Sequence, residues 1–284
     1  MTANNRVHLT RRKRRDGDPR RWLKEMKLTR LHILLAVLVL TFCAYPFRTQ
    51  LRRPFVAALQ HSRGMKTVSD RVAQFGDTVN ARLAPAFDQI GSPYPPKKMT
   101  LIGLKAEEKL QVWISGTDKK WKHLKTYPIL GMSGELGPKL KEGDMQVPEG
   151  IYGLESLNPN SLYHLALRVA YPNADDILRG KADGRPDLGG DIMIHGKDCS
   201  IGCLAMGDEA AEDLFVLAAQ TGIDNVTVIL CPVDFRLRDL PKDMPTTPVW
   251  AQDLYGAIRQ ELKTYESQQW GPGYPPQGVG SPDP

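Results

Sequence analysis

The stretch IHGKDCSIGCLAM, residues 194–206, places His195 eight residues before Cys203. The mainly apolar run 191–194 that leads into it predicts a buried strand ending at His195. A tight turn through Gly202 would then bring the imidazole and the thiol together. Such a pair is the minimum requirement for thiol acyl transfer, because the imidazole takes the thiol proton and the thiolate attacks a carbonyl.

The residues directly before the cysteine complete a candidate catalytic set. Glycine allows close backbone approach, so the N–H groups of Gly202 and Cys203 are candidates for an oxyanion hole. The Ser200 hydroxyl is a candidate support for the cysteine loop, with an ordinary turn residue as the alternative. We therefore predict Cys203 as nucleophile, His195 as general base and acid, Gly202 as an oxyanion donor and Ser200 as support.

Three other interpretations of this stretch remain open at the level of sequence. His195, Cys199 and Cys203 are spaced four apart and would line one face of a helix, where they could hold zinc. Two nearby glycines and the absence of a fourth ligand argue against that site, and we predict no metal. A disulfide between Cys199 and Cys203 is the second interpretation, either structural or as a reversible mask of the thiol. The third is two ordinary buried cysteines beside a core histidine.

Several motifs, in one order, resemble the YkuD-type L,D-transpeptidase domain. That family's pattern of His-Gly, a variable loop and Ser-X-Gly-Cys corresponds here to residues 195–196 and 200–203. The segment 137–152 and the Tyr-Pro-Asn segment 171–175 are similar to the YafK-type branch of the family. The resemblance spans roughly residues 98–232. It implies a mainly β fold, a YkuD-like β-sandwich with a few helices, and cysteine acyl transfer on peptidoglycan.

Two departures from the family pattern concern the same loop. Many members carry a histidine where this chain has Ile201, and an arginine where it has Ala205. The resemblance implies that this arginine helps to hold a substrate carboxylate, so the contacts of donor or acceptor are in question. Further candidate substrate-binding residues share aromatic, cationic or small character near the motifs. They are Gly196, Tyr152, Tyr163, Arg168 and Tyr171.

The positive charge of the chain is concentrated in its first residues. The net charge is +6, yet the first 30 residues alone contain eleven Lys or Arg and three Asp or Glu. The uncharged run 33–45 follows, which predicts an uncleaved membrane anchor with the basic tail in the cytoplasm. A cleaved signal peptide is the alternative for the apolar run, and nucleic-acid binding is the alternative for the tail. We predict an inner-membrane protein with its catalytic domain in the periplasm and no nucleic-acid partner.

Hydrophobic periodicity predicts the remaining elements. Apolar residues at three- and four-residue steps between Val68 and Ile90 predict a helix, whose length Pro85 should limit. Alternation at Leu110, Val112 and Ile114 predicts a half-buried strand. Further strands are expected at 127–132, 151–155, 163–169, 191–195 and 226–230. Helices are expected from an Asp208 cap to about Thr221, stopped by Gly222, and from Trp250 to Tyr265.

These patterns divide the chain into six parts. The parts are a basic cytoplasmic tail (1–30), a transmembrane signal-anchor (31–47), a helical juxtamembrane segment (48–97), a catalytic domain (98–232), a C-terminal helical extension (233–268) and a disordered tail (269–284).

The function predicted first is peptidoglycan L,D-transpeptidation on diaminopimelate-containing stem peptides, with no cofactor. The same thioester could instead pass to water, as in an amidase or carboxypeptidase, including one that releases wall-linked lipoprotein. A non-catalytic wall-binding anchor is a second alternative, and a zinc-binding regulator with a DNA-reading tail is a third. The sequence leaves the acceptor undetermined.

Overall fold

The computed structural model describes residues 64–265, and its central feature is a nine-stranded sheet. The strands follow one another in space in the order β3-β2-β1-β9-β5-β6-β7-β8-β4. Their bounds are β1 Lys98–Leu104, β2 Lys109–Ser115, β3 Trp121–Pro128, β4 Gly131–Met132, β5 Gly150–Ser161, β6 His164–Val169, β7 Met193–His195, β8 Leu204–Ala205 and β9 Val226–Cys231. Most neighbours are antiparallel, but β1 pairs with β9 and β7 pairs with β8 in parallel.

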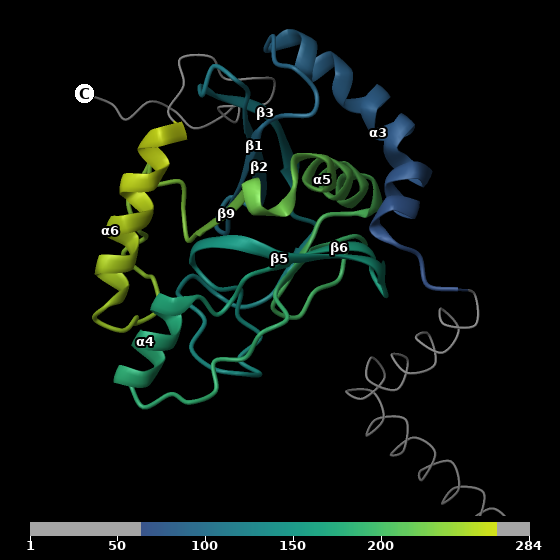
Figure 1. The fold of residues 1–284 in the computed structure, drawn as a ribbon. Coiled ribbons are helices and arrows are strands. Elements are labelled where there is room, and N and C mark those ends of the chain that lie inside the picture. Colours follow the sequence, from purple (N-terminus) through teal and green to yellow (C-terminus); the bar gives the residue numbers. More distant parts are fainter. Residues whose placement is uncertain (1–63, 266–284) are drawn as a thin grey trace, which may run out of the picture. The chain divides into compact units, whose positions relative to one another are not determined.

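Within residues 64–265, four α-helices and two short 3-10 helices accompany the sheet. They are α3 Val68–Gln89, α4 Ala174–Ala182, α5 Asp208–Thr221, α6 Ala251–Leu262, η1 Ile223–Asn225 and η2 Lys263–Tyr265. In Figure 1, α6 lies on one side of strands β1, β2 and β9, whereas α5 and α3 lie on the other.

This arrangement buries both faces of the central strands. Leu110, Val112 and Ile114 of β2 pack into the core beneath α3 and α5, while Trp113 of the same strand packs into a second core beneath α6. The strand predicted at 110–114 is therefore confirmed, but it is buried on both faces and not half-buried as predicted. Gln111, the polar residue between them, is buried because it bonds to the Trp113 indole and to Arg236.

The prediction of a sheet-dominated fold with a few helices is confirmed, whereas the β-sandwich arrangement stays a prediction. The strands form one continuous series, and β5, which has two bulges, pairs with β9 in one half and with β6 in the other. Bulges bend a strand, so a single long strand carries the sheet around this corner. The result is a mixed, sheet-dominated fold with few helices.

Helix α3 is attached to the domain by a buried carboxylate. It begins with a capping box between Thr67 and Asp70 and continues past Pro85 to Gln89, so Pro85 limits its length less than predicted. Arg82 in α3 donates to Asp213 of α5 at 2.8 Å. Tyr127 of β3 donates to the other oxygen of Asp213 at 2.7 Å. One buried carboxylate thus links two helices to the sheet.

The caps of α5 and α4 show two further differences from the sequence prediction. Gly207, with φ of 80°, is the N-cap of α5, and Asp208 instead accepts the backbone N–H of Lys197. Gly222, with φ of 84°, ends α5 as predicted. Helix α4 was not predicted, although its capping box between Asn173 and Asp176 is visible in the sequence as Asn-X-X-Asp.

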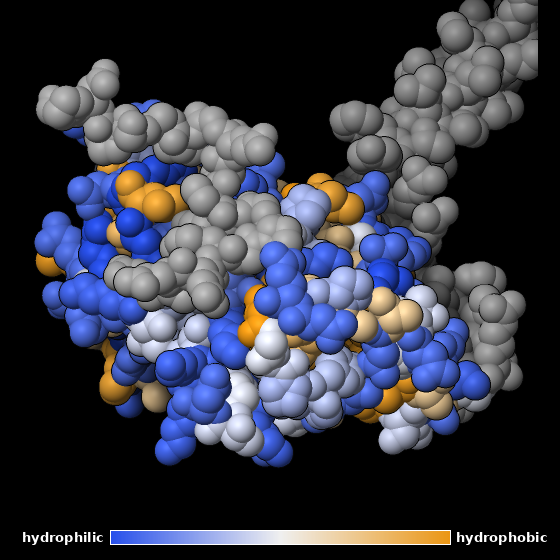
Figure 2. Space-filling model, turned by 90° about the horizontal axis from the view of Figure 1, so that it is seen from above, coloured by the Kyte–Doolittle hydropathy of each residue, from blue (hydrophilic) through white to orange (hydrophobic). Residues whose placement is uncertain are grey.

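Helix α3, the sheet and α6 belong to one compact unit. The predicted divisions after residues 97 and 232 stay predictions. The basic tail, the predicted anchor at 31–47 and the tail 269–284 lie outside the described residues. Within residues 64–265, no helix is both long and apolar enough to span a bilayer. Figure 2 shows one face, on which hydrophilic residues predominate and hydrophobic ones form small separate patches.

Replacing the linking carboxylate should loosen the whole domain. Asp213→Ala leaves the buried Tyr127 hydroxyl and the Arg82 guanidinium without their shared acceptor. Breaking a buried pair of this kind costs about 3–5 kcal/mol of unfolding free energy. Urea unfolding of the variant should show this loss, and Asp243→Ala, at an exposed loop position, should change the stability by less than about 0.5 kcal/mol. Equal stability of the two variants would contradict the linking role.

Candidate active site

The pairing of β7 with β8 brings the predicted histidine and cysteine into one neighbourhood. His195 is opposite Ala205 and Ile194 is opposite Leu204, so Cys203 comes next to Met193. The Met193 N–H donates to the Cys203 Sγ at 3.4 Å. His195 lies two residues beyond Met193 and therefore on the same face of the strand. A strand spacing of about 4.8 Å and a rise of about 3.3 Å per residue separate the Cα atoms of His195 and Cys203 by about 8 Å, within side-chain reach.

His195 is held as a neutral imidazole. Its Nδ1 lies 2.6 Å from the carbonyl oxygen of Gly196, which can only accept, so the lone pair resides on Nε2. Burial lowers the pKa of His195, and the hydrogen bond to Gly196 opposes that shift. The Tyr163 ring lies against the imidazole with 4.7 Å between the ring centroids. These two contacts fix the tautomer and the ring plane of His195.

The cysteine loop is closed by the hydroxyl of Ser200. This Oγ accepts the Cys203 N–H at 2.9 Å and donates to the Cys203 carbonyl at 2.6 Å. On its sulfur side, Cys203 donates to the Asp191 carbonyl at 3.5 Å. Ser200 makes the hydrogen bonds expected of a support residue.

Ser133 is a site residue that the sequence analysis missed. Its half-buried hydroxyl accepts the Gly202 N–H at 2.6 Å and donates to the Met145 carbonyl at 2.7 Å. Ser133 is 70 residues before the nucleophile, directly after β4, and only the pairing of β4 with β8 brings it to the loop. A serine at that separation carries no local signal in the sequence.

The two predicted oxyanion donors therefore both have partners in this structure. The Gly202 N–H points to Ser133, and the Cys203 N–H points to Ser200. This differs from the expectation that both amides face an incoming oxygen directly.

Two of the predicted substrate-binding tyrosines belong to the core, and that prediction is corrected. Tyr152 is 4% exposed and donates to the Glu149 carbonyl, and Tyr171 is 5% exposed and donates to the Leu188 carbonyl. Their rings pack edge to face at 5.9 Å. Burial raises the pKa of both phenols, which stay neutral. Neither side chain can reach a substrate.

The other predicted binding residues lie nearer to the cysteine. Arg168 is opposite Met193 in the sheet and forms ion pairs with Asp191 at 2.8 Å and with Glu155 at 3.0 Å. Gly196 is buried, and a side chain there would collide with Asp208 and with the Tyr163 backbone. Its glycine is therefore explained by packing rather than by substrate contact.

The structure also bears on the alternative interpretations of this stretch. His195 ends a strand while Cys199 and Cys203 lie in the following loop, so the helical face that a zinc site required does not form. No disulfide joins Cys199 to Cys203, and the first is exposed while the second is half-buried. Ala205, at the position of the family arginine, is fully buried, and Ile201 is 64% exposed beside the nucleophile.

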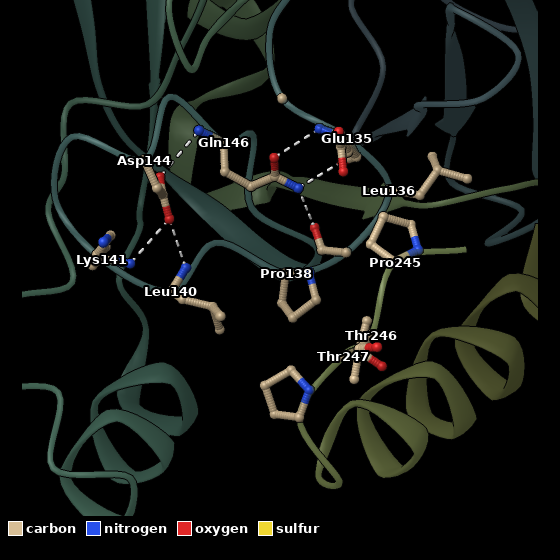
Figure 3. Close-up of a pocket in the computed structure, with 13 residues that line it drawn as sticks. Glu135, Leu136, Pro138, Leu140, Lys141, Asp144, Gln146, Pro245, Thr246 and Thr247 are labelled. Atoms are coloured by element: carbon tan, nitrogen blue, oxygen red, sulfur yellow. Dashed lines mark hydrogen bonds between the residues drawn. The ribbon is translucent and has the colours of Figure 1, made fainter. Parts of the chain in front are cut away.

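A groove adjoins the cysteine loop. It has a volume of about 440 Å³, and Figure 3 shows its wall of Leu136, Pro138 and Leu140 facing Pro245 and Thr247. Its lining residues are Gly134, Glu135, Leu136, Gly137, Pro138, Leu140, Lys141, Asp144, Gln146, Pro245, Thr246, Thr247 and Pro248. Gly134 follows Ser133 and Gln146 follows Met145, so the groove begins where the serine contacts the loop. One wall comes from the segment before α6, outside the predicted catalytic domain.

A buried ion pair fixes both ends of the loop that lines this groove. The Lys105 ammonium donates to Glu149 at 2.8 Å and to the carbonyls of Gly137 and Val147 at 2.9 and 3.1 Å. Glu149 also accepts the Gly137 N–H at 2.7 Å and the Tyr255 hydroxyl at 2.8 Å. All three protons of the ammonium are thereby used.

No family model matches this chain. In sequence, it is 34% identical over 140 residues to the protein named "Putative L,D-transpeptidase YafK" from Escherichia coli K12, which covers 48% of this chain and 53% of that protein. The protein of the same name from Escherichia coli O157:H7 matches equally. The chain thus spans about half the length of the curated relatives it matches.

Solved structures give weaker likenesses. The helical cell shape determining protein Pgp2 from Campylobacter jejuni is 25% identical, with 47% of each chain covered and a TM-score of 0.39. Bd1075 from Bdellovibrio bacteriovorus is 19% identical, with 59% of this chain and 55% of that chain covered and a TM-score of 0.36. L,D-transpeptidase 1 from Mycobacterium tuberculosis is 15% identical, with 47% and 62% covered and a TM-score of 0.27.

The ordered motifs and the match to YafK over 140 residues support a YkuD-like family with a YafK relationship.

Removing the carboxylate beneath the groove should destabilise the protein. Glu149→Gln leaves the Lys105 ammonium buried without a counter-charge, a change that costs about 3–5 kcal/mol. The loss is measurable by urea unfolding. The double variant Lys105→Met, Glu149→Gln should recover part of it, because no charge remains buried. If the double variant lost as much unfolding free energy as the two single variants lose together, the buried ion pair would not be the cause of the loss.

Proposed function

We propose that this protein is a peptidoglycan L,D-transpeptidase that works through a cysteinyl acyl-enzyme. The observation that carries the proposal is the parallel pairing of β7 with β8, which brings a neutral, buried His195 and the Cys203 loop together. The likeness to a protein named as an L,D-transpeptidase supports the choice of reaction.

The first half-reaction forms a thioester. His195 Nε2 takes the Cys203 proton, and the thiolate attacks the carbonyl carbon of a diaminopimelate residue in a tetrapeptide stem. The carbonyl oxygen becomes an oxyanion while the new C–S bond forms. The C–N bond to the terminal D-alanine then breaks, and the His195 imidazolium returns its proton to the leaving amine. D-alanine departs, and the stem remains on Cys203.

The second half-reaction transfers the stem to an amine. The side-chain amine of a second stem loses its proton to His195 and attacks the thioester carbonyl. The C–S bond breaks, the Cys203 thiolate recovers its proton, and an amide cross-link is released. No electron transfer occurs, and every proton is accounted for by the imidazole, the thiol and the two amines.

The groove beside Ser133 is the proposed seat of the donor stem. Its volume of about 440 Å³ lies in the range of small-ligand sites. Exposed Ile201 and Met145 give apolar contacts next to the nucleophile. Arg168 is the proposed partner of a substrate carboxylate. It lies next to Met193, and its ion pairs to Asp191 and Glu155 are with exposed acids, which a substrate carboxylate can replace.

The proposed location is the periplasmic side of the inner membrane. It rests on the apolar run 33–45 and the cationic residues that precede it. Peptidoglycan lies on that side, so the anchor would hold the catalytic unit near its substrate.

Hydrolysis is the second candidate function, favoured by one observation. Ala205 replaces the family arginine and is fully buried, so this position offers no cation to an incoming stem. Water would then complete the reaction on the same thioester, in a peptidoglycan amidase or carboxypeptidase. Wall-linked lipoprotein is a further proposed substrate for that reaction.

Mass spectrometry of the full-length chain with tetrapeptide muropeptide tests the nucleophile and the acceptor. We expect a covalent adduct on Cys203, release of D-alanine and cross-linked dimers. Cys203→Ala should abolish all three, whereas Cys199→Ala, four residues away, should keep them. An adduct with shortened monomers only would favour hydrolysis, and turnover by Cys203→Ala would refute the assignment.

The pH dependence of turnover tests the role of His195. Because burial lowers the pKa of this imidazole, the neutral base persists below its ordinary pKa of about 6.5. The acid limb of kcat/KM should therefore fall below pH 6.5. An acid limb clearly above pH 6.5 would contradict a desolvated neutral base.

A further inference from the structure

The hydrogen bonds around the nucleophile leave one hydroxyl in the position of an oxyanion donor. The Cys203 N–H donates to the Ser200 hydroxyl, and that hydroxyl donates to the Cys203 carbonyl. These two hydrogen bonds are closed within the loop. The Gly202 N–H is directed outward to Ser133, across from the loop. An oxygen that approaches the nucleophile beside Gly202 therefore meets the Ser133 hydroxyl.

Ser133 is well placed to act on such an oxygen. Its Oγ is 2.6 Å from the nitrogen of the residue preceding the nucleophile. The hydroxyl donates a hydrogen bond to the carbonyl of Met145, which is 55% exposed and has a φ of 55°. Gly134, the next residue, lines the groove proposed for the donor stem. The hydroxyl therefore lies at the junction of groove and loop.

We propose that Ser133 is a catalytic residue whose hydroxyl donates a hydrogen bond to the oxyanion formed at the scissile carbonyl. The inference rests on the proposed function, in which Cys203 attacks that carbonyl. The proton of Ser133 turns from the Met145 carbonyl to the substrate oxygen and stays on Oγ throughout. No bond to Ser133 is made or broken, and the proton balance of the two half-reactions is unchanged.

The geometry favours donation over blockage of the site by Ser133. To expose the Gly202 N–H, Ser133 would have to give up both its hydrogen bonds, to Gly202 and to Met145. Donation needs only rotation about the Cβ–Oγ bond, by which the hydroxyl exchanges one acceptor, the Met145 carbonyl, for another, the substrate oxygen. The bond from Gly202 to Oγ remains and polarises the hydroxyl, which makes it a better donor.

Two small reagents separate oxyanion stabilisation from thiol reactivity. Acetylation of Cys203 by p-nitrophenyl acetate passes through a tetrahedral oxyanion, whereas alkylation by iodoacetamide does not. The full-length chain with Cys199→Ser removes the neighbouring exposed thiol, and peptide mass mapping assigns the adduct to Cys203. The ratio of the two second-order rate constants is the readout.

Ser133→Ala should lower the acetylation rate by about 100-fold, as expected for loss of one oxyanion donor, and change alkylation by less than about twofold. Ser133→Thr, which keeps the hydroxyl, should restore most of the acetylation rate. An unchanged ratio, or equal loss of both rates, would show a merely structural role and overturn the proposal. A rise in the ratio would overturn it too, because Ser133 would then block the site.

The outcome is separable from that of the proposed function. If muropeptide turnover depends on Cys203 but the ratio is unaffected by Ser133→Ala, only the present inference fails. If the ratio falls as expected but no muropeptide is processed, the donor role stands and the peptidoglycan substrate is wrong.

Discussion

The parallel pairing of β7 with β8 is the constraint on which the candidate site depends. Parallel neighbours usually need a connection of a dozen or more residues, whereas only the loop 196–203 joins these two strands. So short a connection requires backbone in the left-handed region, which Lys197 and Gly202 adopt with φ of 64° and 83°. The sharp return of the chain is what presents the thiol beside the strand that ends in His195.

Hydrogen bonds from outside the loop hold this return in place. The Gly207 N–H donates to the Lys197 carbonyl at 2.8 Å, and Asp208 accepts the Lys197 N–H at 3.0 Å. The start of α5 therefore holds the start of the loop by two hydrogen bonds. At the end of the loop, the Gly202 N–H donates to the Ser133 hydroxyl. The Cys203 loop is therefore positioned by a helix on one side and by the segment after β4 on the other, and both must be in place before its geometry is set.

The groove shows the same dependence on distant parts of the chain. Its inner wall is shaped by the loop that Lys105 and Glu149 fix, and its outer wall is the segment 245–248. That segment is continuous with α6, which packs on the face of the sheet opposite α5. Trp250 adds a further connection, because its indole donates to Asp183 at 2.8 Å just after α4. The C-terminal extension is thus part of the candidate binding surface.

Local signals in the sequence were enough to indicate the strand before His195, the helix 208–221 with its glycine stop, and the chemistry of a histidine and cysteine separated by one loop. These depend on periodicity and on residue type, which neighbours in sequence express directly. The resemblance to YafK was also recognisable from ordered motifs, and the match over 140 residues supports it. The roles of Cys203 and His195 in turnover remain predictions.

Only the tertiary structure decided which polar and aromatic residues face the site. Tyr152 and Tyr171 looked like binding residues, yet the strand β5 and the turn before α4 direct both into the core. Ser133 looked unremarkable, yet the pairing of β4 with β8 carries its hydroxyl to Gly202. The alternation of apolar and polar residues in β2 predicted one solvent-exposed face, but α6 packs on that face and buries it. Residue type and spacing along the chain indicate which chemistry a side chain can perform. Contacts between segments far apart in sequence determine whether that side chain can reach a substrate.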